Sequence, residues 1–174
     1  MKNPARVAAA LAASIVPGIA LAQTRCTETT RFDPPLRVLH CTDGLSLETE
    51  RSATLRPIDR NGDGQLEGAE IGGRAVLVTL PPRSRPRKGG FQILTPHAIA
   101  SVRGTVYAVD VTDAKTAVFV ARGHVVVARR NAPGVSVTLA PGEGVDVDGD
   151  QQRPLDVRRW PQERVRGLLE RFGQ

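Results

Sequence analysis

The chain has 174 residues and a formal net charge of +6 at pH 7, with 24 basic against 18 acidic residues. Aromatic residues make up only 3% of it, and this scarcity argues against a protein that stacks nucleic-acid bases on aromatic rings. The length suits a single domain preceded by a leader.

Residues 1–22 have the pattern of a cleavable signal peptide. Lys2 and Arg6 precede the apolar run "VAAALAASIV" (residues 7–16), and "ALA" (residues 20–22) matches a signal-peptidase site. The apolar run is shorter than the ~20 residues that a membrane-spanning helix needs. We therefore expect export to the periplasm or the extracellular space, a mature chain that begins at Gln23, and no transmembrane segment in that mature chain.

The two cysteines of the chain, Cys26 and Cys41, both lie in residues 23–43. An exported protein meets an oxidising environment, and the pair lacks the C-x-x-C spacing of a redox motif. We expect a structural disulfide that pins this N-terminal segment and stabilises the fold by on the order of 3 kcal/mol in the chain-entropy model.

Residues 44–157 are predicted to form a β domain, and strand patterns begin just before it. Short alternating or β-branched runs bounded by turn residues are typical of strands. Such runs are "LRVLHC" (36–41), "LSLETE" (45–50), "RAVLVTL" (74–80), "FQIL" (91–94), "TVYAVDV" (105–111) and "TAVFVA" (116–121).

The segment "DRNGDGQLEGAEI" (residues 59–71) matches the calcium-binding loop of an EF-hand. Such a loop gathers hard oxygen ligands from its first, third, fifth, seventh and twelfth positions. The residues at these positions are Asp59, Asn61, Asp63, Gln65 through its carbonyl, and Glu70. The flanks do not predict the two helices of an EF-hand, so the loop is expected to join two strands. Calcium binding and a metal-free turn rich in Asp, Asn and Gly both remain open, and no other cofactor is expected.

Four basic residues gather in "PPRSRPRKGG" (residues 81–90), namely Arg83, Arg85, Arg87 and Lys88. Prolines and glycines flank them and prevent a regular element. One interpretation is a solvated loop between two strands. The other is a contact with an acidic partner or an anionic surface.

A glycine followed by a valine-rich strand recurs at Gly123 ("GHVVVA"), Gly134 ("GVSVTL") and Gly144 ("GVDVDG"). Short strands at this spacing, each led by a turn residue, suit either a sandwich or a solenoid whose coils stack their strands. Burial is expected for the central valines of the stack, which are Val102, Val109, Val118, Val126 and Val137.

Residues 158–174 are predicted to form a C-terminal amphipathic helix. Val165, Leu168, Leu169 and Phe172 fall on one face of a 3.6-residue period, and Pro161 suits the first helical position. We expect the helix to cap an open end of the β core and to bury Trp160 and Phe172. The alternative use of a basic amphipathic helix is peripheral contact with anionic lipid.

No catalytic constellation emerges from the sequence. His40, His97 and His124 are isolated from one another, and Ser101 has no base near it. We therefore expect a protein that is not an enzyme.

The runs "ILTPHAIASVRGTVYAVDV" (93–111), "TAVFVARGHVVVA" (116–128) and "VTLAPGEGVDVDG" (137–149) resemble the FecR periplasmic domain family. The resemblance is close over residues 91–147. It implies a β-solenoid-like fold of short stacked strands. It also implies a role as the periplasmic half of a membrane-bound sigma-factor regulator, a half that recognises a protein partner.

The signalling members of that family carry a cytoplasmic region and a transmembrane helix before the domain, and a receptor-interacting segment after it. This sequence shows a cleavable leader instead, so it is identified as a stand-alone exported member. The expected function is a noncatalytic interaction or signalling module that binds an unidentified envelope protein. The alternative is a calcium-binding structural or adhesive envelope protein.

Overall fold

The computed structural model describes residues 25–82, 90–150 and 153–174. The predicted signal peptide (residues 1–22) and the basic residues Arg83, Arg85, Arg87 and Lys88 lie outside the described residues. Within the described ranges, the chain forms fourteen strands, one α-helix and one 3-10 helix. None of the helices found in those ranges is both long and apolar enough to cross a bilayer.

The strands follow one another closely along the chain. In order they are β1 (Cys26–Phe32), β2 (Pro35–Cys41), β3 (Ser46–Glu50), β4 (Thr54–Ile58), β5 (Gly68–Gly72), β6 (Arg74–Thr79), β7 (Phe91–Leu94), β8 (Ala98–Val102), β9 (Val106–Val111), β10 (Lys115–Arg122), β11 (Val125–Arg129), β12 (Ala132–Leu139), β13 (Glu143–Asp148) and β14 (Arg158–Arg159). The helix α1 (Gln162–Leu169) and the 3-10 turn η1 (Glu170–Phe172) end the chain.

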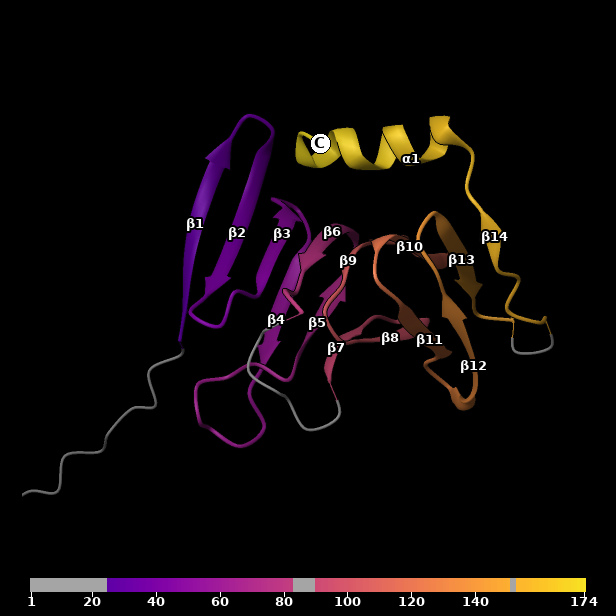
Figure 1. The fold of residues 1–174 in the computed structure, drawn as a ribbon, viewed down its shortest axis with the longest axis horizontal. Coiled ribbons are helices and arrows are strands. Elements are labelled where there is room, and N and C mark those ends of the chain that lie inside the picture. Colours follow the sequence, from indigo (N-terminus) through magenta and orange to yellow (C-terminus); the bar gives the residue numbers. More distant parts are fainter. Residues whose placement is uncertain (1–24, 83–89, 151–152) are drawn as a thin grey trace, which may run out of the picture.

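These strands form two sheets, which lie one above the other beneath the helix (Figure 1). The larger sheet has the order β1-β2-β3-β6-β9-β10-β13-β14, and the smaller has the order β12-β11-β8-β7-β5-β4. All pairs are antiparallel except β5 with β7. The protein is thus mostly β with a short C-terminal helix, as predicted. The solenoid-like stack is not confirmed, because stacked coils would pair their strands in parallel.

The main core fills the space between the two sheets. In the larger sheet, cross-strand register aligns Val76, Val109, Val118 and Val145 in one row, and each is at most 1% exposed. β-branched residues pack well when they face one another across a pleated sheet, which is why this row favours strands. The smaller sheet supplies an opposing row of inward residues that includes Ile93, Ala100 and Val127.

The predicted burial of the valines is confirmed in part. Val102, Val109 and Val118 are buried, but Val126 is 42% exposed and Val137 is only partly buried at the sheet edge. Strand β11 has Val125 and Val127 in the core. Because side chains alternate between the two faces of a strand, Val126 must point out of the sandwich.

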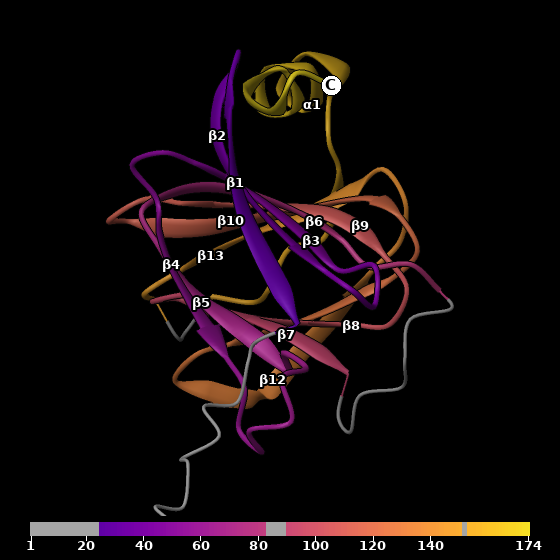
Figure 2. The same cartoon turned by 90° about the vertical axis from the view of Figure 1, so that its left-hand side faces the viewer.

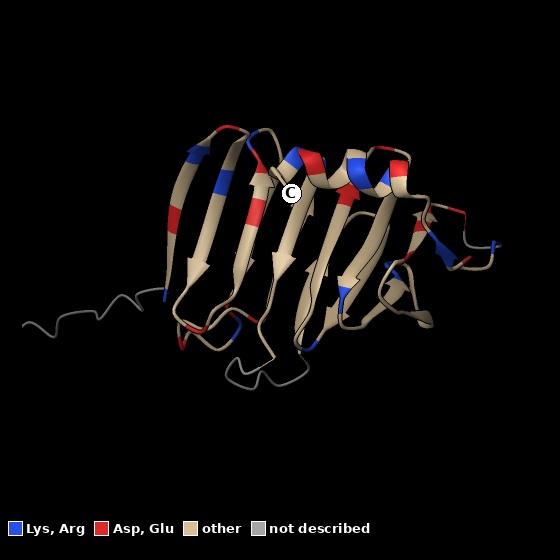
Figure 3. Ribbon diagram, turned by 45° about the horizontal axis from the view of Figure 1, so that its top comes forward, with Lys and Arg blue, Asp and Glu red and all other residues tan. Residues whose placement is uncertain are grey.

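The C-terminal helix lies across the outer face of the larger sheet (Figures 1 and 2). Leu168, Phe172 and Trp160 are buried there against outward-facing residues such as Leu77 and Phe119. The predicted burial of Trp160 and Phe172 is therefore confirmed. The predicted end cap is wrong, because the helix covers a face rather than an open end. The apolar surface of the helix is used in this packing, and its outer surface mixes acidic and basic residues (Figure 3).

Arg171 ties the end of this helix to the sheet below. Its guanidinium donates hydrogen bonds to both oxygens of Glu50 (3.1 and 2.5 Å) and to both oxygens of Asp110 (2.8 and 3.0 Å). Glu50 also accepts a bond from the backbone N–H of Ala75. Burial would raise the pKa of Glu50, but the bonds from Arg171 and Ala75 outweigh it and hold the pKa below its usual value of 4.5.

We expect Arg171→Gln to destabilise the fold by about 2 kcal/mol near neutral pH, because two partly buried carboxylates lose their shared cation. The pKa of Glu50 is lower in the folded protein, so this stabilisation is present above its unfolded pKa and is lost as pH falls through the folded value. Denaturant unfolding at pH 7 and below pH 4 measures both effects. The control, Arg166→Gln on the outer helix surface, should change stability by less than about 0.5 kcal/mol. Equal losses in the two variants would contradict the role of Arg171.

Candidate functional site

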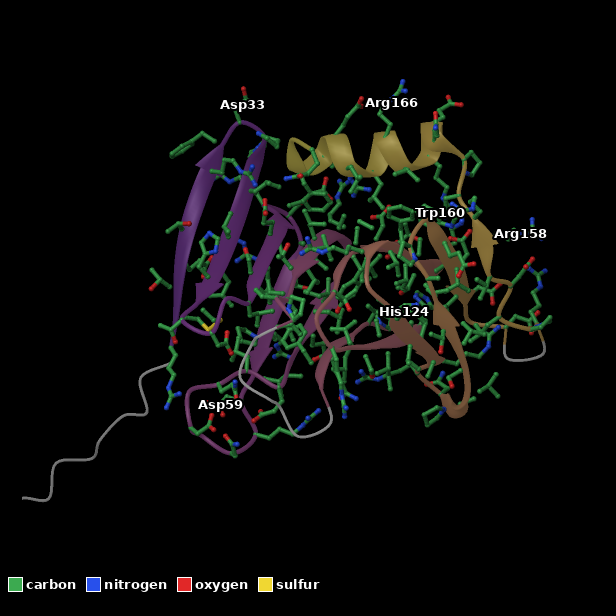
Figure 4. The ribbon with its side chains drawn as sticks, viewed as in Figure 1. Asp33, Asp59, His124, Arg158, Trp160 and Arg166 are labelled. Atoms are coloured by element: carbon green, nitrogen blue, oxygen red, sulfur yellow. A yellow bond between two sulfur atoms is a disulfide. The ribbon has the colours of Figure 1, made fainter. Side chains whose placement is uncertain are left out.

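The β4–β5 connection is organised by its own acidic and amide side chains (Figure 4). The two oxygens of Asp59 accept hydrogen bonds from the backbone N–H groups of Gly62 (2.8 Å) and Gly64 (2.9 Å). Asn61 accepts from the N–H of Asp63, and Asp63 accepts from the N–H of Gln65. These short-range bonds turn the loop back on itself, as Asp and Asn do in turns.

The loop brings three carboxylates together. One oxygen from each of Asp59, Asp63 and Glu67 lies within 4.8 Å of the other two. Hard oxygen donors converging from a short loop are what Ca²⁺ requires. Glu67 also accepts a bond from the N–H of Arg60 at 2.7 Å, which holds it towards the loop. The sequence comparison with the EF-hand did not select Glu67, because it stands at the ninth position, which in that loop often acts through a water.

Glu70, the predicted twelfth-position ligand, is placed elsewhere. It lies on β5 opposite Arg56 of β4, and its carboxylate is 3.9 Å from Arg56 and 3.5 Å from Arg130. The side-chain amide of Gln65 donates to Asp43 at 3.2 Å. The structure therefore brings together Asp59 and Asp63 of the predicted set, keeps Asn61 in the same loop, and separates Glu70 from them.

The N-terminal segment supports this loop from one side. Cys26 and Cys41 form a disulfide between β1 and β2, as predicted. The adjacent Arg25 donates its backbone N–H to the carbonyl of Gly64 at 3.2 Å. A cavity of about 310 Å³ lies between the two segments, lined by Arg25, Cys41, Thr42, Asp43, Gly64, Gln65 and Leu66. The disulfide and the loop are thus parts of one local structure.

A larger cavity of about 440 Å³ lies beside β13 and β14, and we call it the charged groove. Its lining contains both aspartates and arginines. Its ion pairs are Arg164 with Asp146 (2.5 Å), Arg153 with Asp148 (3.4 Å), Arg129 with Asp148 (3.6 Å) and Arg158 with Asp156. The sequence indicated none of this, because the members are spread from residue 129 to residue 164.

Trp160 forms the aromatic wall of the charged groove. One face stacks on Phe119 with ring centroids 5.3 Å apart, and the guanidinium of Arg164 lies 3.5 Å from the ring centroid. Such a cation–π contact is worth about 1 kcal/mol, more when desolvated. Trp160 is itself only 7% exposed, so the groove offers a partner several exposed charges of both signs, held beside a rigid aromatic ring.

The three histidines do not form a site together. His97 places its Nδ1 atom 3.2 Å from the hydroxyl of Thr116, whose hydroxyl also lies 2.8 Å from that of Thr95. Thr95 and Thr116 are fully buried, so this network ties a turn to the core. In the described part of the chain, the one group of metal-binding side chains that comes together is Asp59, Asp63 and Glu67.

The sequence model of the family described as FecR protein matches residues 37–126. This match runs from β2 into β11 and so includes most of both sheets. No curated protein is significantly similar to the chain in sequence.

Two crystal structures, each described as a "putative anti-sigma factor" from Parabacteroides distasonis, have a similar fold. The structure at 2.50 Å resolution has a TM-score of 0.58 and 16% identity, with 83% of this chain and 64% of that chain covered. The structure at 1.65 Å has a TM-score of 0.56 and 17% identity, with 87% and 63% covered. This chain thus spans less than two thirds of the length of either structure.

The position of Trp160 gives a test of how the charged groove is built. A Cβ atom at Gly144 would lie 2.4 Å from the indole ring and 2.7 Å from the carbonyl of Val118. We expect Gly144→Ala to displace the ring and to cost about 1–3 kcal/mol. Trp160 is the single tryptophan of the chain, so its fluorescence should shift to longer wavelength.

The matched control is Gly149→Ala, where an added Cβ meets nothing within 4 Å. It should leave both the emission and the stability unchanged. An unchanged emission spectrum in Gly144→Ala would show that Trp160 does not pack against this strand.

Proposed function

Because this chain belongs to the FecR protein family, we propose that it is a noncatalytic signalling module that recognises another protein in the cell envelope. The family match over residues 37–126 carries this proposal. The fold likeness to structures described as "putative anti-sigma factor" supports a signalling or regulatory role. The leader pattern in residues 1–22 supports a location in the periplasm or outside the cell.

The charged groove supports protein recognition. Arginine is a residue type that interfaces favour, and four arginines line this cavity. Arg153 and Arg158 expose 71% and 76% of their side chains, while each has a carboxylate neighbour. A partner that offers both acidic and basic side chains would find complementary groups here. The basic residues Arg83, Arg85, Arg87 and Lys88 are a second proposed contact, suited to an acidic partner.

We expect Arg158→Ala to lower the yield of a specific envelope crosslink by about tenfold, the effect of losing one interface residue of moderate importance. Crosslinking in intact cells followed by affinity capture, with quantification of the same crosslinked band, provides the measurement. The variant should fold normally, because the side chain of Arg158 is exposed and, among the described residues, bonds only to the exposed Asp156.

The matched control is Arg166→Ala on the outer helix surface (Figure 4), which should retain the crosslink. A third variant replaces Arg83, Arg85, Arg87 and Lys88 by glutamine. If the crosslink survives in both this variant and Arg158→Ala, neither surface is the recognition site.

Calcium binding by the β4–β5 loop is a second proposed function, and the convergence of Asp59, Asp63 and Glu67 favours it. The site lacks the flanking helices that hold an EF-hand loop in place, so the loop must be ordered at the expense of binding energy. Its affinity should then lie in the weak class of extracellular modules, about 10⁻⁴ to 10⁻³ M. The bound ion would stiffen the connection between β4 and β5 and the disulfide segment beside it.

We expect calcium at ten times its dissociation constant to stabilise the protein by about 1.4 kcal/mol, which raises the melting temperature by a few degrees. Thermal melts with millimolar calcium and with chelator measure this shift. Glu67→Gln should abolish the shift, because the carboxylate charge is lost at the cluster. Glu70→Gln should keep it, because Glu70 bonds with arginines away from the cluster. If calcium does not change the melting temperature of the parent protein, the proposal is contradicted.

A further inference from the structure

The two sheets end in four edge strands, and three of them are protected against pairing with another strand. An edge strand presents unpaired backbone N–H and C=O groups, and proteins block this with charges, prolines or very short strands. Strand β1 carries Glu28 and Arg31, and β4 carries Arg56 followed by Pro57. Strand β14 has two residues, both arginine.

The fourth edge strand, β12, has no such protection along most of its length. Its eight residues, "APGVSVTL", include no charged side chain. Pro133 and Val135 lie within the bulge of its pairing with β11, so residues 136–139 remain as the regular part. Val135 is 52% exposed, and Val126 on the neighbouring strand is 42% exposed. In the described ranges, β12 has a strand neighbour on one side only, which is β11.

The direction of the backbone groups of β11 follows from one hydrogen bond. Arg130, just after β11, donates its N–H to the carbonyl of His97 on the β8 side at 2.8 Å. Successive residues of a strand direct their backbone groups to alternate sides. Val127, three residues before Arg130, therefore directs its backbone groups towards β12, where its partner is Val137.

The same alternation then decides which groups of β12 are open. Because Val137 directs its N–H and C=O towards β11, its neighbours Ser136 and Thr138 direct theirs away from the sheet. Both residues can donate, since neither is proline. The open edge thus has two full donor–acceptor positions, separated by a valine that contacts the core.

We propose that β12 pairs with β12 of a second copy of this chain, antiparallel about a two-fold axis at Val137. In this register Ser136 of each copy faces Thr138 of the other, and each such pair exchanges two backbone hydrogen bonds. An isologous contact of this kind closes after two copies.

Charge favours a second copy as the occupant. Residues 23–174 have 22 basic against 18 acidic residues, a net charge of +4, so two copies repel each other overall. Residues 136–139 are neutral, and the edge of one copy presents the same backbone and hydroxyl groups as the edge that it would receive. Two basic chains can therefore approach at this edge without a like-charge contact along the paired segment.

Val137→Cys tests the axis directly. Directly opposed residues of a non-hydrogen-bonded antiparallel pair have Cα atoms about 4.5 Å apart, within the range of a disulfide. Both native cysteines are already bonded to each other. Under mild oxidation, Val137→Cys should give a covalent dimer, whereas Thr54→Cys on the opposite edge of the same sheet should stay monomeric. Equal crosslinking of the two variants would overturn the proposal.

Sedimentation equilibrium of the parent and of edge variants tests the backbone pairing. Ser136→Pro removes one outward N–H from each copy and should weaken the dimer by about tenfold or more, whereas Ser136→Ala keeps the N–H and should not. Val135→Lys places an additional positive charge beside the paired segment of each copy and should also weaken the dimer, and it keeps every backbone donor. Circular dichroism verifies the fold of each variant. A parent protein that is monomeric from micromolar to millimolar concentration, or dimers of equal strength in all variants, would overturn the proposal.

Discussion

The larger sheet is apolar on both faces, and the rest of the structure depends on covering both of these faces. Strand β10 has consecutive buried residues from Thr116 to Val120 rather than an alternating pattern. Its inward residues meet the smaller sheet, and its outward residues, Ala117 and Phe119, would face water without the C-terminal helix. Exposing such surface costs roughly 25 cal/mol per Å². The helix is therefore a structural layer of the fold and not an appendage.

This layering places the candidate sites at the margins of the sandwich. The apolar surface of the helix is occupied by the sheet, so the helix contributes Arg164 to the charged groove. Trp160, just before the helix, lies over Gly144 in the same lining. Hydrogen bonds from Arg164 and Lys115 outweigh burial and hold the pKa of Asp146 below its usual value. The carboxylate of Asp146 therefore stays ionised near neutral pH and keeps its ion pair with Arg164. This ion pair holds the Arg164 guanidinium over the ring of Trp160.

Some elements follow from local sequence and others do not. The predicted strands at residues 91–94 and 105–111 match β7 and β9 to within one residue, because β-branched and aromatic residues there alternate or run together. Strand β1 was not predicted, and β4 was expected only as a strand before the acidic loop, without bounds. Both are edge strands with polar, charged or proline residues, which protect an edge and also weaken the strand pattern.

By itself, the sequence determined the β class, the disulfide pair, the amphipathic helix with its buried Trp160 and Phe172, and the family, since each depends on residue types at short spacing. The tertiary structure alone decided which sheet each strand joins, the face that the helix covers, and which acids converge. Glu70 matches the loop pattern, yet β5 begins at Gly68 and pairs with β4 and β7, which places Glu70 beside Arg56 and leaves Glu67 with Asp59 and Asp63. Pairings between strands distant in the chain set these positions, and no short-range pattern encodes them.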